Sequence, residues 1–389
     1  MAELSDPVGT VEILEKLVAF DTTSSNANQP LIEWVVDYLD RYGINSRVDP
    51  GPPGKANLIA RLGPPGEDGI VLCGHTDVVP VEGQPWTKDP FRLTREGTRL
   101  YGRGTADMKG FIASALAVVP ALAGRPLQRP VTLALTYDEE VGCRGAPSLA
   151  EALHADGPAP ALVITGEPTR MSVVRSHKGI RVLRTTVIGR EGHSSRPDQS
   201  ASAIMAAARI VGFIEDVAAQ LVSHGVSVPG FAPRHTTMNV GTISGGTALN
   251  IVPRSCDFVW EYRAVPGEDV DSIQRRVERF ATEEVLPTLL ATALEASITT
   301  EVIADVPALD PSANQAGARF VRELGGLAEG DPVAYGTDGA VLQGRGLPTV
   351  ICGPGSMEQG HQPDEFIEQS QLELCDSFMA RLAVERSNG

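Results

Sequence analysis

The sequence has few cysteines and no long apolar run, and both shortages limit the kinds of protein that the chain can be. Its five cysteines are scattered, odd in number and without a CxxC spacing, so we expect buried thiols in a reducing compartment. No apolar run approaches the roughly 20 residues that a membrane-spanning helix needs, so no membrane partner is expected. The first residues, Met1–Asp6, have neither a basic nor an apolar signal region, which predicts a cytoplasmic protein.

Excess positive charge is also lacking, since the formal net charge is -16. Nucleic-acid binding draws on clustered Lys and Arg, so no nucleic-acid partner is expected. The nucleophile motif G-x-S-x-G occurs nowhere, which disfavours a serine hydrolase. A dinucleotide-binding fingerprint is missing too, because Gly102 and Gly104 are not followed by the rest of GxGxxG.

Short apolar runs that alternate with helical patterns predict an α/β fold. The runs at 70–73, 131–136 and 161–165 are typical of strands buried on both faces. Apolar residues recur at helical spacing from Val11 and from Leu31. At 389 residues the chain exceeds the size at which one core keeps growing, so two domains are expected.

A different pattern begins near residue 181 and predicts an inserted domain. Strands are expected at 181–188, 236–243, 255–263 and 296–303, with helices at 201–221 and 270–290. The order β-α-β-β-α-β is that of a ferredoxin-like unit. This unit, residues 181–303, would interrupt a first domain made of residues 1–180 and 304–389.

Residues of metal-ligand type directly follow the three predicted buried strands. Ligand sites of open α/β sheets lie outside the carboxyl ends of the strands, so these side chains are expected at one edge of the sheet. With others farther along the chain they form the set His75, Asp77, Asp107, Glu139, Glu140, Glu167 and His361. Brought together, such residues would hold two divalent cations beside a water, which is equipment for hydrolysis.

Several members of this set have a plainer interpretation when they are taken alone. Asp107 could be a helix N-cap, and Glu139 with Glu140 could be an acidic surface turn. On a regular strand the two glutamates would point apart, so one could bind metal while the other serves as general base, provided that the backbone turns there. Asp107 has the short carboxylate that a bridging ligand requires between cations about 3.5–4 Å apart.

The ordered motifs of the chain resemble those of the M20 metallopeptidase family. They run in the expected order over nearly the whole chain as Cys73–Pro80, Trp86–Phe91, Leu100–Gly110, Asp138–Glu140, Gly166–Pro168, Ser176–Gly179, Gly192–Ser195, Cys352–Ser356 and His361–Glu365. The resemblance implies a catalytic domain with a mixed sheet and flanking helices that carries two zinc ions, with cobalt or manganese as possible substitutes. The inserted unit would be a lid that also forms a homodimer.

Carried over residue by residue, the resemblance assigns the metal ligands. One zinc ion would bind His75 and Glu167, the other would bind Glu140 and His361, and Asp107 would bridge the two. These assignments use only side chains that the motifs themselves contain.

Further roles follow from the same resemblance. Glu139 would be the general base, and Asp77 would accept a hydrogen bond from the imidazole of the neighbouring ligand. His193 would reach the partner subunit's site and stabilise the oxyanion. Without the resemblance, the plainer interpretation of His193 is a residue of a surface loop. Arg263 and Asn250 would hold the substrate α-carboxylate, and an exposed salt bridge is the alternative for the arginine.

The implied substrate is an N-acyl amino acid, first of all N2-acetyl-L-ornithine, whose deacetylation would serve arginine biosynthesis. Asp338, which follows Thr337, could receive a cationic side chain, and the family also has Glu at this position. An N-succinyl-diaminopimelate, another N-acyl amino acid or a dipeptide are the alternatives. A non-catalytic relative that only binds amino acids would have lost ligands, and none is missing.

Overall fold

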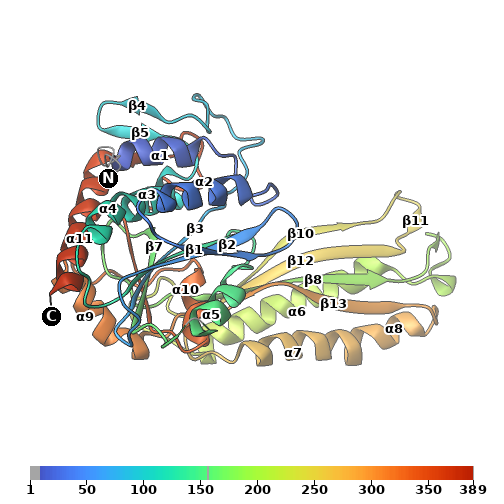
Figure 1. The fold of residues 1–389 in the computed structure, drawn as a ribbon. Coiled ribbons are helices and arrows are strands. Elements are labelled where there is room, and N and C mark those ends of the chain that lie inside the picture. The colour runs from blue at the N-terminus through green and yellow to red at the C-terminus, as the bar shows by residue number, and fades with distance from the viewer. Residues whose placement is uncertain (1–8, 156, 389) are drawn as a thin grey trace. The chain divides into compact units, whose positions relative to one another are not determined.

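The computed structural model describes residues 9–155 and 157–388, which divide into two compact units (Figure 1). Unit 2 comprises His177–Ala308 and Val333–Gly336, and unit 1 comprises the rest. The sequence predicts the divisions at 180/181 and 303/304. The divisions lie farther out because the first strand of unit 2 begins at Gly179 and its last strand ends at Val306.

Unit 1 is built on a six-stranded mixed sheet in the order β1-β2-β6-β3-β7-β14. Its strands are β1 (Ser46–Pro50), β2 (Ala56–Leu62), β3 (Ile70–His75), β6 (Val131–Thr136), β7 (Leu162–Pro168) and β14 (Thr349–Gly353). The pairs from β6 through β3 and β7 to β14 are parallel, whereas β1 and β2 run antiparallel to their neighbours. Every residue of β3, β6 and β7 is buried, as the continuous apolar runs predict.

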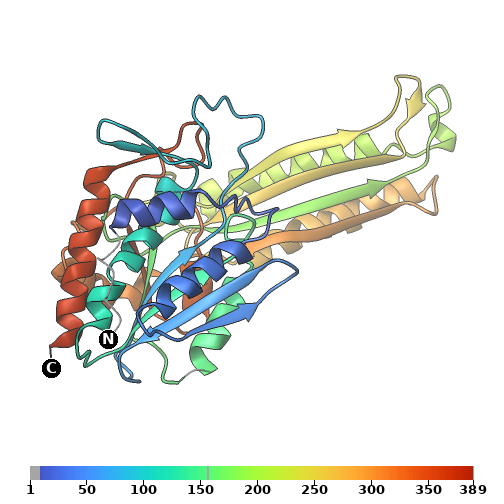
Figure 2. The same cartoon turned by 45° about the horizontal axis from the view of Figure 1, so that its top comes forward.

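Helices cover both faces of this sheet (Figures 1 and 2). On one face lie α1 (Thr10–Val18), α2 (Gln29–Asp40), α3 (Gly110–Ala117), α4 (Val119–Ala123), α9 (Gln315–Glu323) and α11 (Gln369–Ser387). On the other face lie α5 (Ala146–Ala155) and α10 (Asp338–Gly344). Because side chains alternate along a strand, Leu58 and Leu72 join the first cluster while Ile59 and Val71 join the second.

The stretch 105–123 meets the length and composition of a membrane span, which the sequence alone did not lead us to expect. It comprises the irregular turn η1 (Thr105–Lys109) followed by α3 and α4. Of its most apolar window, 78% is buried inside the structure, and Phe111, Ile112 and Leu116 belong to the core of unit 1. Such burial is typical of a core helix.

A small three-stranded sheet completes unit 1 and joins two distant segments of the chain. Its order is β15-β5-β4, with β4 (Thr94–Glu96), β5 (Arg99–Tyr101) and β15 (Phe366–Glu368). These strands are too short to be predicted from periodicity. They place the segment that precedes Asp107 beside the segment that follows His361.

Unit 2 consists of a four-stranded antiparallel sheet with helices on one face. The strands are β8 (Gly179–Ile188), β10 (Thr237–Gly245), β12 (Ser255–Ala264) and β13 (Ser297–Val306), in the order β10-β12-β8-β13. The helices are α6 (Ala203–His224), α7 (Val270–Phe280) and α8 (Leu286–Leu290), the last two joined by the turn η3 (Ala281–Val285). Along the chain these elements follow the predicted order β-α-β-β-α-β.

The core of unit 2 lies between this sheet and its helices. Phe258, Trp260 and Leu183 pack in one cluster with Ile210 of α6 and Val277 of α7. Two further strands, β9 (Gly192–His193) and β11 (Ile251–Val252), pair as a separate two-stranded sheet. Short 3-10 turns, η2 (Pro197–Gln199) and η4 (Pro311–Asn314), lie in unit 2 and unit 1 respectively. All five cysteines are buried and free, which confirms the prediction of buried thiols.

Candidate metal centre

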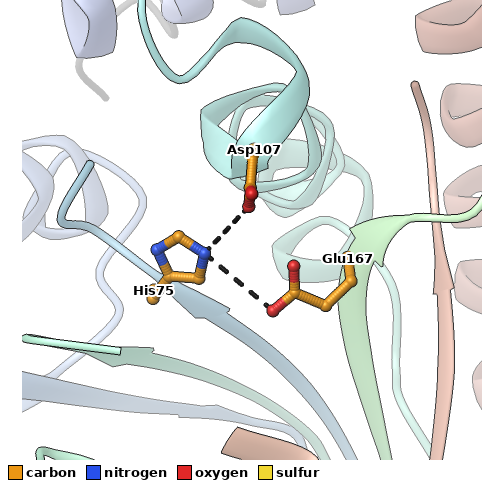
Figure 3. Close-up of side chains that lie close together, drawn as sticks. All are labelled: His75, Asp107 and Glu167. Atoms are coloured by element: carbon orange, nitrogen blue, oxygen red, sulfur yellow. Dashed lines mark hydrogen bonds and ion pairs between the residues drawn. The ribbon is translucent and has the colours of Figure 1, made fainter. Parts of the chain in front are cut away.

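A first group of candidate metal ligands consists of His75, Asp107 and Glu167, all of them buried (Figure 3). His75 ends β3, and Glu167 lies near the end of the neighbouring parallel strand β7. The Nε2 atom of His75 lies 3.0 Å from Oδ1 of Asp107 and 3.9 Å from Oε1 of Glu167. One donor atom from each residue lies within 4.8 Å of the other two, so the group has the size of a metal site.

A second group consists of Asp107, Glu140 and His361, with donor atoms that also lie within 4.8 Å of one another. The Nε2 atom of His361 lies 3.1 Å from Oε2 of Glu140 and 3.2 Å from Oδ2 of Asp107. Asp107 therefore belongs to both groups and faces each with a different oxygen, Oδ1 toward His75 and Oδ2 toward His361. This is the arrangement of a carboxylate that bridges two ions.

A turn after β6 presents Glu139 and Glu140, as their adjacency requires. The strand ends at Thr136, and Asp138 has a φ of 54°, in the left-handed region that few non-glycine residues adopt. His361 has a φ of 61° and is thus held in the same region. Such conformations are costly, and they cluster at functional sites where the surroundings impose them.

Asp77 differs from its expected role. The Nδ1 atom of His75 lies 2.9 Å from the backbone carbonyl oxygen of Asp77, but 3.6 Å from its Oδ1. The carbonyl contact still directs Nδ1–H away from the site, so that the unprotonated Nε2 is free to bind a metal ion. The carboxylate instead accepts hydrogen bonds from the backbone N–H groups of Glu139 and Glu140, at 3.0 and 3.3 Å, and from Ser24 Oγ at 2.7 Å. Asp77 therefore shapes the turn that carries both glutamates.

Burial and like charge raise the pKa of the carboxyl groups in this cluster. Burial first, and then the charge of Asp107, raises the pKa of Glu140 to about 7 and that of Glu167 well above its usual value. Burial and Glu140 likewise raise the pKa of Glu139, although His75 opposes them. Positive charge placed among these groups would favour their ionised forms.

The pKa values of the two imidazoles are raised as well, in their case by the neighbouring carboxylates. Hydrogen bonds to Asp107 and Glu140 raise the pKa of His361 to about 10. Burial would lower the pKa of His75, but its hydrogen bond to Asp107 and the nearby Glu167 raise it well above the usual value. Burial would raise the pKa of Asp107, and the hydrogen bonds from both histidines outweigh it and lower that pKa.

The donor set fits a divalent metal ion. Oε1 of Glu167 is buried and has no hydrogen-bond partner among the described residues, although it points toward His75. Leaving a buried polar group unpaired costs about 1–3 kcal/mol, and more for a charged one. Imidazole nitrogen and carboxylate oxygen are ligands that zinc accepts, so a cation here would satisfy this oxygen.

Glu139 belongs to neither ligand group of the described residues. The charges of His75, Glu140 and Asp107 nevertheless act on its carboxylate. Its Oε1 lies 3.6 Å from Sγ of Cys143. A carboxyl group with a raised pKa beside two candidate ligand groups suits a general base.

His193 and Asn250 lie side by side in unit 2. His193 in β9 pairs with Ile251 in β11, and the backbone N–H of Ser194 donates to the carbonyl oxygen of Asn250 at 3.0 Å. Both predicted residues are exposed, and Nδ1 of His193 lies 2.7 Å from Oγ of Ser195. The structure therefore joins two residues that are distant in the sequence.

Arg263 lies at the other end of strand β12 from Asn250. It stands eight residues after Ser255, the first residue of β12, which is roughly 26 Å of strand. Its guanidinium contacts Glu261, with Nε 3.2 Å from Oε1, and the carbonyl oxygen of Ala334 at 3.4 Å. Arg263 and Asn250 of one protomer are therefore too far apart to hold one carboxylate together, so the expected joint contact would need residues from two protomers.

Asp338 is buried inside unit 1 rather than exposed to a substrate. It begins α10, and its Oδ2 accepts a hydrogen bond from Oγ1 of Thr136 at 2.5 Å. Burial raises its pKa to about 6. This geometry does not support the expected contact with a substrate ammonium group.

A polar network around Arg103, Glu365 and Gln84, not predicted from the sequence, contacts the backbone of two candidate ligands. Arg103 and Glu365 lie within the quoted motifs, but a charged residue in a motif gives no sign of its partner. A buried pair of opposite charges could have been sought there, because neither charge is stable alone in a core.

Comparisons with known proteins agree with this geometry. The model of the family described as Peptidase family M20/M25/M40 matches residues 71–385. Acetylornithine deacetylase of Myxococcus xanthus is 37% identical over 387 residues, which cover 97% of each chain.

Two solved structures show the same fold. An M20 family metallo-carboxypeptidase of Sulfolobus solfataricus matches with a TM-score of 0.74 at 17% identity, covering 97% of this chain and 99% of that one. A dinuclear metal binding peptidase of the M20 family from Bacillus subtilis matches with a TM-score of 0.67 at 16% identity, covering 97% of both chains. With the family model and the full-length relative, they confirm the resemblance seen in the motifs. The chain belongs to the peptidase family M20/M25/M40.

Proposed function

We propose that this chain is a dimetal amide hydrolase that removes the acetyl group from N2-acetyl-L-ornithine to give L-ornithine and acetate. The observation that carries the chemistry is the sharing of Asp107 between two ligand groups. Support for the substrate comes from the Myxococcus xanthus deacetylase, which is 37% identical along nearly the whole chain. The reaction would belong to arginine biosynthesis.

His75 and Glu167 would hold one zinc ion, Glu140 and His361 the other, and Asp107 both. Cobalt or manganese could take the place of zinc, because the nitrogen and oxygen donors accept all three metals. Bound divalent cations would polarise the amide carbonyl and lower the pKa of a water molecule toward about 7.

Glu139 would move the proton. It would accept a proton from the attacking water and pass it to the nitrogen of the leaving amine. Burial raises the pKa of Glu139 above its usual value, which makes its carboxylate a better proton acceptor for this role. The carboxylate of Asp77 would hold Glu139 in place, because it accepts a hydrogen bond from the backbone N–H of Glu139.

Unit 2, the inserted domain of residues 181–303 in the sequence prediction, would act as a lid and as the surface of a homodimer. Arg263 would pair bidentately with the substrate α-carboxylate. His193 would donate to the oxyanion, and Asn250 beside it would help to hold the α-carboxylate. Because His193 and Asn250 lie at the opposite end of β12 from Arg263, a site that uses all three requires two protomers.

The proposal includes a cytoplasmic location, supported by five buried free cysteines, which suit a reducing compartment. A second candidate substrate class follows from Asp338. Since this carboxylate is buried against Thr136, no described residue is assigned to the side-chain ammonium of ornithine. N-acyl amino acids with uncharged side chains therefore remain the alternative substrates.

The test is a comparison of kcat/KM on metal-loaded protein. The panel contains N2-acetyl-L-ornithine, N-acetyl-L-norvaline, an N-succinyl-diaminopimelate and a dipeptide, and norvaline is the matched control that lacks the ammonium group. The proposal predicts the highest ratio for acetylornithine, because this ratio reports transition-state binding. Equal ratios for ornithine and norvaline derivatives would favour the second candidate class, and a preference for the dipeptide would refute deacetylation.

A further inference from the structure

A buried ion pair lies beside the candidate metal centre in unit 1. Arg103 and Glu365 are each 1% exposed, and the Nη1 atom of Arg103 lies 2.7 Å from Oε2 of Glu365. Arg103 follows strand β5, and Glu365 precedes β15, so the small sheet brings them together. The desolvation of two charges can cost more free energy than their mutual attraction provides. A buried pair is therefore stable only where further hydrogen bonds satisfy its remaining polar atoms.

Glu365 uses its second oxygen to hold the backbone of Asp107. Oε1 accepts hydrogen bonds from the N–H groups of Ala106 at 2.9 Å and Asp107 at 3.2 Å. The peptide that carries Asp107 is part of the irregular turn η1, where Asp107 itself has extended rather than helical dihedral angles. Glu365 therefore fixes a segment that no regular helix would hold.

Arg103 reaches His361, a member of the second ligand group, through Gln84. Its Nη2 donates to Oε1 of Gln84 at 2.5 Å, and Nε2 of Gln84 donates to the backbone carbonyl oxygen of His361 at 2.9 Å. Nη1 also donates to the carbonyl oxygen of Gln362 at 3.3 Å. Gln84 and Arg103 thus hold two successive carbonyl groups, those of His361 and Gln362, where the backbone at His361 is left-handed.

We propose that Arg103, Glu365 and Gln84 are positioning residues for the metal centre, which set the distance between Asp107 and His361. This inference rests on the proposed function, because it assumes that these two residues bind metal. The network predicts unequal effects. Of the candidate ligands, Gln84 has a printed hydrogen bond to His361 and so acts on the second ligand group, whereas Glu365 holds Asp107 and so acts on both groups.

A nearby ion pair provides a matched control. Arg99 and Glu368 come from the same two strands, β5 and β15, with Nε 2.8 Å from Oε1. Their side chains are 49% and 32% exposed, and their neighbours are Phe366 and Thr98 rather than candidate ligands. If the network served only to join the two strands, changes in either pair would act alike.

The experiment titrates metal-free full-length protein with Zn²⁺ and Co²⁺ against a competing chelator. Bound equivalents are measured by elemental analysis, and the cobalt absorption spectrum reports coordination. Gln84→Ala should weaken one of the two bound ions about tenfold and change only its cobalt signal, as loss of an outer hydrogen bond does. Arg103→Lys and Glu365→Gln should weaken both ions by about 10–100-fold. Arg99→Lys and Glu368→Gln should bind metal as wild type does.

The outcomes separate this inference from the proposed function. Wild-type protein that binds fewer than two ions refutes the dimetal centre and this inference with it. Wild-type protein that binds two ions, together with variants of Gln84 and Arg103 that bind them equally well, refutes the inference alone. Equal losses in the Arg99 and Glu368 controls would refute it too. If Arg103→Lys does not fold, the partly exposed Gln84 carries the test.

Discussion

The two units of the chain differ in how they present their candidate functional residues. In unit 1 the donor atoms of each ligand group lie within 4.8 Å of one another and are mostly buried, and one carboxylate is common to both groups. In unit 2 the predicted residues His193, Asn250 and Arg263 are at least partly exposed and divide between the two ends of β12. The chemistry is assembled within one protomer, whereas substrate recognition, as proposed, needs a second copy of the chain.

The difference follows from strand direction. The strands β3, β6 and β7 are parallel, so their carboxyl ends meet at one edge, and residues that follow them converge. The sheet of unit 2 is antiparallel, so successive strands end at opposite edges and carry their terminal residues apart.

Glu139→Ala tests whether unit 1 separates proton transfer from metal binding. Because Glu139 is in neither ligand group, we expect kcat to fall by about 10²–10⁴, the usual contribution of a general base, with metal content unchanged. Steady-state kinetics and elemental analysis of the same preparation provide the measurement. Glu140→Ala, the adjacent control, should lose metal. If Glu139→Ala also loses metal, Glu139 is a ligand and the separation is wrong.

His193→Ala tests whether unit 2 contributes to the transition state. Loss of one oxyanion donor lowers kcat by about 10²–10³, and the exposed position of His193 makes an effect on folding small. Metal content and the mass of the particle in light scattering should stay as in wild type. Ser195→Ala, which removes the partner of Nδ1, should have a weaker effect on kcat. A kcat equal to that of wild type would remove His193 from the mechanism.

The pH dependence of metal binding tests the candidate metal centre of unit 1 without involving unit 2. In metal-free protein Glu140 has a pKa of about 7 and His361 a pKa of about 10, so at neutral pH His361 is protonated and Glu140 half so. A metal ion must displace these protons, and its affinity should therefore rise with pH, by about tenfold per pH unit for each proton released. Chelator competition between pH 6 and pH 8 measures this. An affinity that does not change with pH would contradict the raised pKa values.

Mixed dimers test the contribution of the second copy. Glu139→Ala and His193→Ala protomers are each expected to be nearly inactive as homodimers. After subunit exchange, half of the dimers would combine them, and one of the two sites in each would have both residues intact. Activity should therefore recover to about a quarter of wild type. If exchange is verified and no activity returns, His193 does not act across the dimer.

Burial and periodicity made most of unit 1 predictable. The strands at 70–75, 131–136 and 162–168 are fully buried, so their apolar runs are continuous, and the residues after them could be placed at one edge. The apolar stretch after Lys109 forms two helices, α3 and α4, that meet at Val118, because Pro120 lacks the N–H to continue the first.

What sequence could not supply were contacts between backbone and side chain. The carboxylate of Asp77 binds the backbone of the glutamate turn rather than His75, and no residue pattern distinguishes these partners. Asp338 follows a threonine, yet as the first residue of α10 it is turned inward to Thr136.

Parallel measurement of metal content and turnover in wild type and Asp107→Asn tests the central claim most directly. An asparagine keeps the size of the side chain but cannot bridge two cations with two charged oxygens. We predict that wild type binds two ions per chain and hydrolyses N2-acetyl-L-ornithine, that a chelator abolishes this turnover, and that Asp107→Asn loses tight binding at both positions together with activity. An Asp107→Asn protein that keeps two ions and normal turnover would contradict the shared carboxylate and the mechanism built on it.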